Sequence, residues 1–320
     1  MTSTSGMTQV GTAEPVIPRR RLIPSMRRSR RTHRLGWWGT PYLFVVLAVG
    51  FLLLFTYTPV MNMFWYSVTS WDGLDKEQEY IGLENYIRVF TREEYFQVFY
   101  VSLYYFVASF VQLGIALYFA TILSFPTRFK NFFKGVLFFP YLINGVAIAF
   151  TFLYFFKPGG TLDAALAFFG VDPGVLWLGD RSVANFSLAG TSVWRYMGLN
   201  FVLFLGAIQS IPGQLYEAAA IDGANKWQQF RFIIAPGIRP ILGLSLILAI
   251  SGSIAVFEIP FIMTHGDNGT MTFVIKTVDI AFENHKVGQA SAMAVILLLI
   301  VLIVTWIQRR IIPDEKVNLV

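Results

Sequence analysis

The sequence predicts an all-α integral membrane protein with six transmembrane helices and a cytoplasmic helix–turn–helix loop. Three observations support this prediction. Only 14% of the 320 residues are charged, against about 25% in soluble domains, so the chain lacks the polar coat of a water-soluble protein. Six apolar stretches are long enough to cross a bilayer, which takes about 20 residues. The basic residues are concentrated between alternate stretches, which is typical of an oriented membrane protein.

The six apolar stretches define the predicted spans. They run approximately over 41–69, 95–125, 135–157, 186–208, 240–263 and 288–307. Pro59 lies in the first span, where a membrane helix tolerates it, and Pro140 is expected to kink the third. The predicted organisation is a basic tail over 1–40, a six-span domain over 41–312 that contains a loop over 212–238, and a C-terminal tail over 313–320.

The charged residues predict the orientation. Eight Arg lie within 19–34, a segment expected to be a cytoplasmic tail that contacts anionic lipid. The cytoplasmic segments then hold 17 of the 25 Lys and Arg, and the outer segments hold 13 of the 19 Asp and Glu. The cytoplasmic segments are the tail, 126–134, 209–239 and 308–320; the outer segments are 70–94, 157–185 and 264–287. Both termini are therefore expected in the cytoplasm.

Several kinds of chemistry are disfavoured by the sequence. There is no Cys for a disulfide or a thiolate metal site, and the three His are far apart. The net charge of +6 resides largely in the tail, so no nucleic-acid partner is expected. The motifs H-E-x-x-H, G-x-S-x-G and G-x-x-x-x-G-K-[ST] are absent, which disfavours a membrane enzyme and ATP binding by this chain. An ATP-independent secondary transporter stays open as an alternative, although such carriers usually contain internal repeats.

The stretch "YEAAAIDGANKWQQFRFIIAPGIRP" interrupts the apolar pattern between the fourth and fifth spans. An Ala-rich helix is expected first, with Glu217 at its exposed start, where the helix dipole favours a carboxylate. Asp222 and Gly223 are expected to break it, since Gly adopts positive φ without strain. A second helix is expected from about Asn225, and Pro236 and Pro240 are expected to end it and start the next span. Its apolar face would consist of Trp227, Phe230 and Ile234. The alternative is an ordinary amphipathic connector at the lipid surface.

This stretch resembles the EAA loop of permease subunits of ABC importers. That motif reads E-A-A, three residues, G, nine residues, I, one residue, L-P. The matching positions here are Glu217, Ala218, Ala219, Gly223, Ile233 and Pro236, with Asp222 just before the glycine. Ala235 stands where Leu is usual. The resemblance implies that the loop docks onto a separate ATPase subunit. ATP and Mg would bind to that subunit, and no cofactor is expected on this chain.

Three further stretches resemble the carbohydrate-uptake branch of this family, closest to the maltose-type first permease subunit. They are "YIGLENYIRVF", "PGGTLDAALAFFGV" and "AFENHKVGQASAMAVIL". A departure is "THGDNG" from Thr264, where the family often reads T-x-G-G-P. The resemblance covers about 40–312 and implies a sugar or oligosaccharide importer in a bacterial inner membrane. The implied partners are a second homologous permease, two copies of an ATPase and an extracytoplasmic solute-binding protein. A non-sugar solute such as glycerol phosphate is the alternative.

Polar residues within the spans are candidates for the solute pathway, because they are costly in a bilayer unless they face a cavity or a partner. Those so identified are Tyr141, Asn144, Ser192, Trp194, Arg195, Tyr196, Asn200, Ser251, Ser253 and Glu258. The solute contacts of maltose permeases, counted from Glu217, imply Ser192, Arg195, Tyr196, Leu199, Ala249, Gly252 and Ser253. Alternatives remain at several positions. Ser251, Gly252 and Ser253 would equally suit close helix packing. Asn144 could bond a carbonyl freed by Pro140, and Arg195 could pair with Glu258 or a partner chain.

Overall fold

The computed structural model describes residues 40–172 and 174–311. The predicted tails lie outside these residues, apart from Thr40. The chain divides into two compact units, Met1–Phe55 and Thr56–Val320. The described residues are almost entirely helical and contain no strand beyond one isolated β-bridge between Thr69 and Tyr80. The predicted all-α class is confirmed.

The first unit contains α1 (Thr40–Leu52), whose described side chains are exposed. A π-helix, η1 (Leu53–Tyr57), follows α1, and the second unit begins at Thr56 within it. Helix α2 (Thr58–Ser67) comes next. Pro59 occupies the first turn of α2, where its missing N–H is least costly. The helix therefore continues past Pro59, as the sequence predicts.

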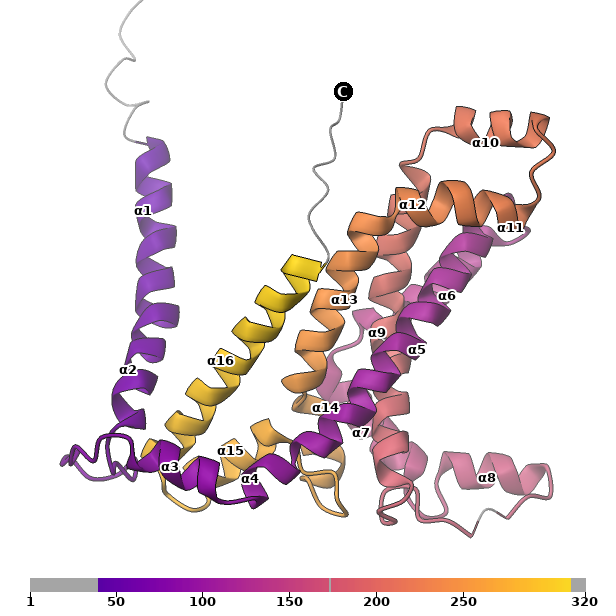
Figure 1. Ribbon diagram of the computed structural model, residues 1–320. Coiled ribbons are helices and arrows are strands. Elements are labelled where there is room, and N and C mark those ends of the chain that lie inside the picture. Colours follow the sequence, from indigo (N-terminus) through magenta and orange to yellow (C-terminus); the bar gives the residue numbers. More distant parts are fainter. Residues whose placement is uncertain (1–39, 173, 312–320) are drawn as a thin grey trace, which may run out of the picture. The chain divides into compact units, whose positions relative to one another are not determined.

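The second unit consists of α2 and the helices that follow it (Figure 1). These are α3 (Glu84–Thr91), α4 (Glu94–Gln97), α5 (Phe99–Ser124), α6 (Lys130–Leu142), α7 (Gly145–Phe156), α8 (Thr161–Phe168), α9 (Ala184–Gln209), α10 (Gly213–Ile221), α11 (Lys226–Gln229), η2 (Phe230–Ile234), α12 (Ala235–Gly237), α13 (Arg239–Ile254), α14 (Glu258–Thr264), α15 (Phe273–Phe282) and α16 (Val287–Ile311).

Four helical segments of the described chain are long and apolar enough to cross a membrane. They are Phe44–Ser67, Glu94–Ser124, Arg239–Thr264 and Val287–Arg310. Two bent pairs also qualify: α6 with α7, bent by 97°, and α9 with α10, bent by 70°. Counting each bent pair as one span gives six, which is the number the sequence predicts.

The third predicted span is not one helix kinked at Pro140. Pro140 lies inside α6, which ends at Leu142, and the chain turns at Ile143 and Asn144. The Asn144 side chain accepts a hydrogen bond from Val146 N–H at 2.8 Å and so caps the start of α7. An N-cap residue favours a new helix start. The position of the break is therefore set by the Asn144 cap and not by Pro140.

The core of the second unit lies where α5 packs along α9, beside α13 (Figure 1). Ala116 and Ala120 of α5 are fully buried, and their small side chains let α9 approach closely. On α9, Phe204 is fully buried in the same cluster. Ile234 and Ile238, from the segment before α13, complete this cluster and are also fully buried. The 212–238 loop is thus anchored in the transmembrane core.

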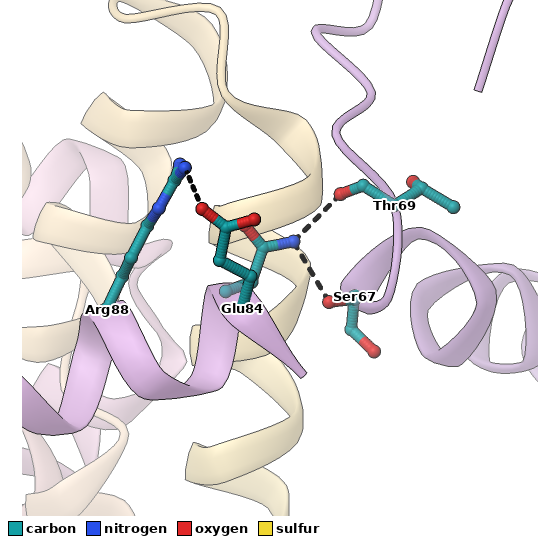
Figure 2. Close-up of polar contacts among 5 residues, drawn as sticks. Ser67, Thr69, Glu84 and Arg88 are labelled. Atoms are coloured by element: carbon teal, nitrogen blue, oxygen red, sulfur yellow. Dashed lines mark hydrogen bonds and ion pairs between the residues drawn. The ribbon is translucent and has the colours of Figure 1, made fainter. Parts of the chain in front are cut away.

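Buried polar groups tie α2, α3 and α16 together, and we call this cluster the Asn85 clamp. Asn85 donates to the carbonyls of Ser67 and Thr69 at 3.0 and 2.8 Å (Figure 2). Gly288 N–H donates to Trp71 O at 2.8 Å, and a Cβ at Gly288 would strike Thr69 O. The clamp therefore joins two of the stretches quoted above, "YIGLENYIRVF" and the start of the last span. The neighbouring Glu84–Arg88 pair is about half exposed and contributes little to stability.

Candidate functional site

A cavity of about 480 Å³ lies among α5, α9, α13 and the start of α14. This volume is within the range of about 300–1,000 Å³ that is usual for small-ligand sites. Eight of the thirteen predicted pathway residues line it: Ser192, Tyr196, Leu199, Asn200, Ala249, Gly252, Ser253 and Glu258. The others do not line it: Tyr141, Asn144, Trp194, Arg195 and Ser251. Polarity and the family resemblance thus identified residues that the fold brings together.

The wall formed by α13 and α14 is broken. Helix α13 ends at Ile254 and α14 begins at Glu258, with Phe257 at φ −141° and ψ −60°. The residues between the two helices, 255–257, also line the cavity. Non-helical backbone at membrane depth is tolerated where it lines a cavity. This break brings Glu258 to the cavity wall.

Arg195 forms an ion pair with Glu258. The Arg195 Nη1 atom donates to Glu258 Oε2 at 2.5 Å. The Arg195 side chain is 14% exposed and that of Glu258 is 38% exposed, so the arginine is the more deeply buried partner. Its guanidinium also lies 5.0 Å from the centre of the Tyr196 ring. Of the alternatives that the sequence left open for Arg195, the structure shows the pair with Glu258.

Helix α7 begins against this pair. A Cβ on Gly145 would strike both Arg195 Nη1 and Glu258 Oε2, so only glycine fits there without displacing the pair. The residue before it, Asn144, caps α7 by accepting from an N–H. Asn144 thus has a capping role, which differs from the carbonyl bond that was one alternative for it. Two broken spans, α6–α7 and α13–α14, meet α9 at the Arg195–Glu258 pair.

The cavity also includes polar residues that the sequence reasoning missed. Tyr105, Ser109 and Gln112 line it from α5, and Ser245 lines it from α13. The spacing of the three α5 residues places them on one helix face, which was a signal available in the sequence. The Tyr105 and Ser245 hydroxyls are buried and have no hydrogen-bond partner within the described chain. The Ser192 and Ser253 hydroxyls, by contrast, bond carbonyls of their own helices.

The 212–238 loop contains the predicted turn between two helices. Gly223 has φ +76° and follows the last residue of α10 and its cap, Asp222. Gly223 N–H donates to Ala220 O at 3.1 Å, and Ala224 N–H donates to Ala219 O at 2.8 Å. This pattern is a Schellman motif, in which a glycine takes the left-handed conformation. The predicted role of Gly223 in the turn is confirmed.

The start of the second loop helix is also confirmed. Asn225 and Gln228 form a capping box, in which each side chain accepts from the other residue's backbone N–H. Two details differ from the prediction. Glu217 lies in the middle of α10 rather than at its start, so the helix dipole gives it no special advantage. The second helix passes through a π-helical turn, η2, and continues past Pro236 to Gly237. The next span, α13, begins at Arg239 with Pro240 in its first turn, as predicted.

The loop has one exposed side and one buried side. Glu217, Ala218, Asp222 and Gly223 are exposed, as is Pro236, and Ala219 is half-buried. Of the predicted apolar face, Ile234 is fully buried, Phe230 is half-buried and Trp227 is 66% exposed. The face is therefore covered only where the loop joins the transmembrane core.

Comparisons with known proteins agree with this geometry. Residues 112–317 match the family described as binding-protein-dependent transport system inner membrane component. The probable ABC transporter permease protein YurN of Bacillus subtilis is 34% identical over 86% of this chain and 97% of its own length. The sn-glycerol-3-phosphate transport system permease protein UgpA of Yersinia pseudotuberculosis is 31% identical over 92% of this chain and 100% of its own.

A similar fold occurs in a solved structure. It is that of a bacterial alginate ABC transporter in complex with an alginate pentasaccharide-bound periplasmic protein. The matching chain has a TM-score of 0.74 at 20% identity, and the match covers 86% of this chain and 95% of that one.

Proposed function

We propose that the cavity of this chain conducts a sugar or oligosaccharide. The premise is that the chain belongs to the family of inner membrane components of binding-protein-dependent transport systems. The chain is a permease subunit of an ABC importer, a transport component rather than an enzyme. The observation that supports a sugar is the cavity lining, which combines hydroxyl, amide and aromatic side chains. Sugar hydroxyls need such donors and acceptors, and sugar rings pack on aromatic faces.

The partners belong to this proposal. A second homologous permease would line the other half of the pathway. Two ATPase copies would hold ATP and Mg, and one of them would dock on the exposed side of the 212–238 loop of this chain. An extracytoplasmic binding protein would deliver the solute; the solved alginate transporter contains such a protein. The proposed docking residues are Glu217, Ala218, Ala219, Asp222, Gly223 and Pro236. Membrane lipid would surround the spans, whose apolar side chains are largely exposed in the single chain.

Filling the cavity tests the proposed pathway. Leu199 lines the cavity, whereas Val202 on the same helix does not and is 39% exposed. We expect Leu199→Trp to abolish ATP-dependent uptake and Val202→Trp to preserve it, because only the first indole occupies the cavity. The measurement is uptake of a panel of radiolabelled mono- and disaccharides by the importer assembled with its partner subunits. Uptake of none of these sugars by the native importer, or normal uptake by Leu199→Trp, would contradict the proposal.

The proposed orientation places both termini and the 212–238 loop in the cytoplasm of a bacterial inner-membrane protein. The sequence contains no Cys, so single introduced cysteines give an unambiguous label. We expect Asp267→Cys to react with a membrane-impermeant maleimide added to intact cells and Asn225→Cys to react only after permeabilisation. Labelling of Asn225→Cys from outside would show the opposite orientation.

A further inference from the structure

We infer that the Arg195–Glu258 pair makes this cavity select uncharged, polyhydroxylated solutes over anionic ones. The inference rests on the proposed function only in assuming that the solute passes through the cavity. The charge preference itself is a property of the cavity wall and is open to measurement without transport.

The first observation is the charge of the lining. Among the described residues that line the cavity, Glu258 alone carries a charge and none is basic. The other polar groups are neutral hydroxyls and amides, including Tyr105, Gln112, Asn200 and Ser245. The cavity wall therefore has no positively charged side chain that could bind an anion.

The second observation concerns the nearest cation. Arg195 lies between the lining residues Ser192 and Tyr196 on α9, yet its guanidinium is bound to Glu258 at 2.5 Å and does not line the cavity. The Tyr196 ring lies beside it, and Gly145 leaves no room for even a methyl group next to the pair. These neighbours hold the guanidinium on the carboxylate. The structure thus has a cation close to the cavity whose charge is already matched.

These observations have a direct consequence for binding. An anion that enters the cavity loses hydration and meets the Glu258 carboxylate, with no unmatched positive charge to compensate. A neutral solute with hydroxyl groups loses less on desolvation and meets the neutral amide side chains of Gln112 and Asn200 in the lining. The relative UgpA is named for transport of sn-glycerol 3-phosphate, an anion. We expect this chain to differ from such a permease in the charge it accepts.

The test measures the charge preference with thiol reagents, because the chain has no native Cys. Gly252 lines the cavity and has nothing within 4 Å of a Cβ, so Gly252→Cys places a thiol there without displacing neighbours. The full chain, assembled with its partner subunits in detergent, is treated with three methanethiosulfonates of similar size. These carry a sulfonatoethyl, a hydroxyethyl or a trimethylammonioethyl group. Rates are divided by those measured with free cysteine, and Ala218→Cys on the exposed loop is the control position.

In the otherwise native chain, the anionic reagent should modify Gly252→Cys more slowly than the neutral one. Adding Glu258→Gln frees the Arg195 charge and should raise the anionic-to-neutral rate ratio about tenfold, a typical effect of one unit charge at short range. Arg195→Gln alone should lower the ratio. In the double variant, Arg195→Gln with Glu258→Gln, the anionic-to-neutral rate ratio should be close to the ratio for free cysteine. The thiol pKa affects all three reagents alike and cancels in the ratio, and the ratio at Ala218→Cys should not change.

An anionic reagent that reacts as fast as the neutral one in the native pair would overturn the inference. The same holds if the ratio is unchanged in Glu258→Gln. Should Glu258→Gln fail to assemble, the other two variants still test the inference: the ratio should fall below the native one in Arg195→Gln and lie close to that of free cysteine in the double variant, and equal ratios in these two variants would overturn it. The assay uses no sugar, so absent sugar uptake would refute the proposed function alone, while an unchanged ratio would refute only the charge preference.

Discussion

Replacing Gly223 with proline is expected to abolish solute-stimulated ATP hydrolysis while the transmembrane helices stay inserted. Gly223 has φ +76°, whereas proline is fixed near −65°. Proline also lacks the N–H that Gly223 donates to Ala220 O. The substitution should destabilise the turn by about 3 kcal/mol or more, which corresponds to about a hundredfold or more in its equilibrium population. The two loop helices would lose their fixed angle.

The effect should reach the cavity because the loop is anchored. Ile234 and Ile238 are fully buried against Phe204 and Ile208 of α9, and α9 supplies lining residues to the cavity. A rigid turn therefore connects the proposed ATPase surface with the helices around the proposed pathway. A turn that has lost its geometry would not transmit displacement between them.

Gly213→Pro is the matched control. Gly213 is the first residue of α10, a position where proline is favoured, and the preceding Pro212 is in a conformation that proline tolerates after it. Copurification of the ATPase and ATP hydrolysis in proteoliposomes should both be near native in Gly213→Pro. Native values for both quantities in Gly223→Pro would mean that the loop is an ordinary surface connector.

The second large effect is expected at Gly145, where alanine should impair both stability and uptake. The added methyl group would lie too close to Arg195 Nη1 and Glu258 Oε2, so the paired side chains or α7 must shift. Breaking a buried pair costs about 3–5 kcal/mol, and solvent access to Glu258 reduces our expected loss to about 2 kcal/mol.

Thermal unfolding in detergent measures the stability loss, and uptake of the transported sugar measures its functional consequence. Gly135→Ala in α6 is the control, because a Cβ there has nothing within 4 Å. That change should be neutral or slightly stabilising, since alanine favours a helix over glycine. Equal behaviour of the two variants would show that the pair tolerates displacement and that Gly145 has no special role.

Local features of this protein could be predicted from its sequence, whereas features set by distant contacts could not. The turn at Gly223 depends on a few neighbouring residues, and its glycine is visible in the sequence. The polar face of α5 at Tyr105, Ser109 and Gln112 was visible too, but nothing local showed that this face meets α9 and α13. The Arg195–Glu258 pair was one of several alternatives, because its partners are 63 residues apart and on different helices.

The break between α6 and α7 illustrates the same difference. Proline was the obvious local cause of a kink, yet the helix passes through Pro140 and ends after it. The start of α7 is fixed by the Asn144 cap and by the position of Gly145 against two side chains from other helices. Tertiary contacts therefore decide where this span turns.

The Asn85 clamp has a consequence for how the protein is made. Asn85 finds its two carbonyl partners within a short stretch of chain, so that part can form early in synthesis. Gln289 donates to Tyr95 Oη across 194 residues, and Gly288 must reach the carbonyl of Trp71. The ribosome delivers these last residues only after five earlier spans. A nascent or truncated chain without α16 therefore leaves the Tyr95 hydroxyl and the Trp71 carbonyl without these partners, so the packing around α3 is completed only at the end of synthesis.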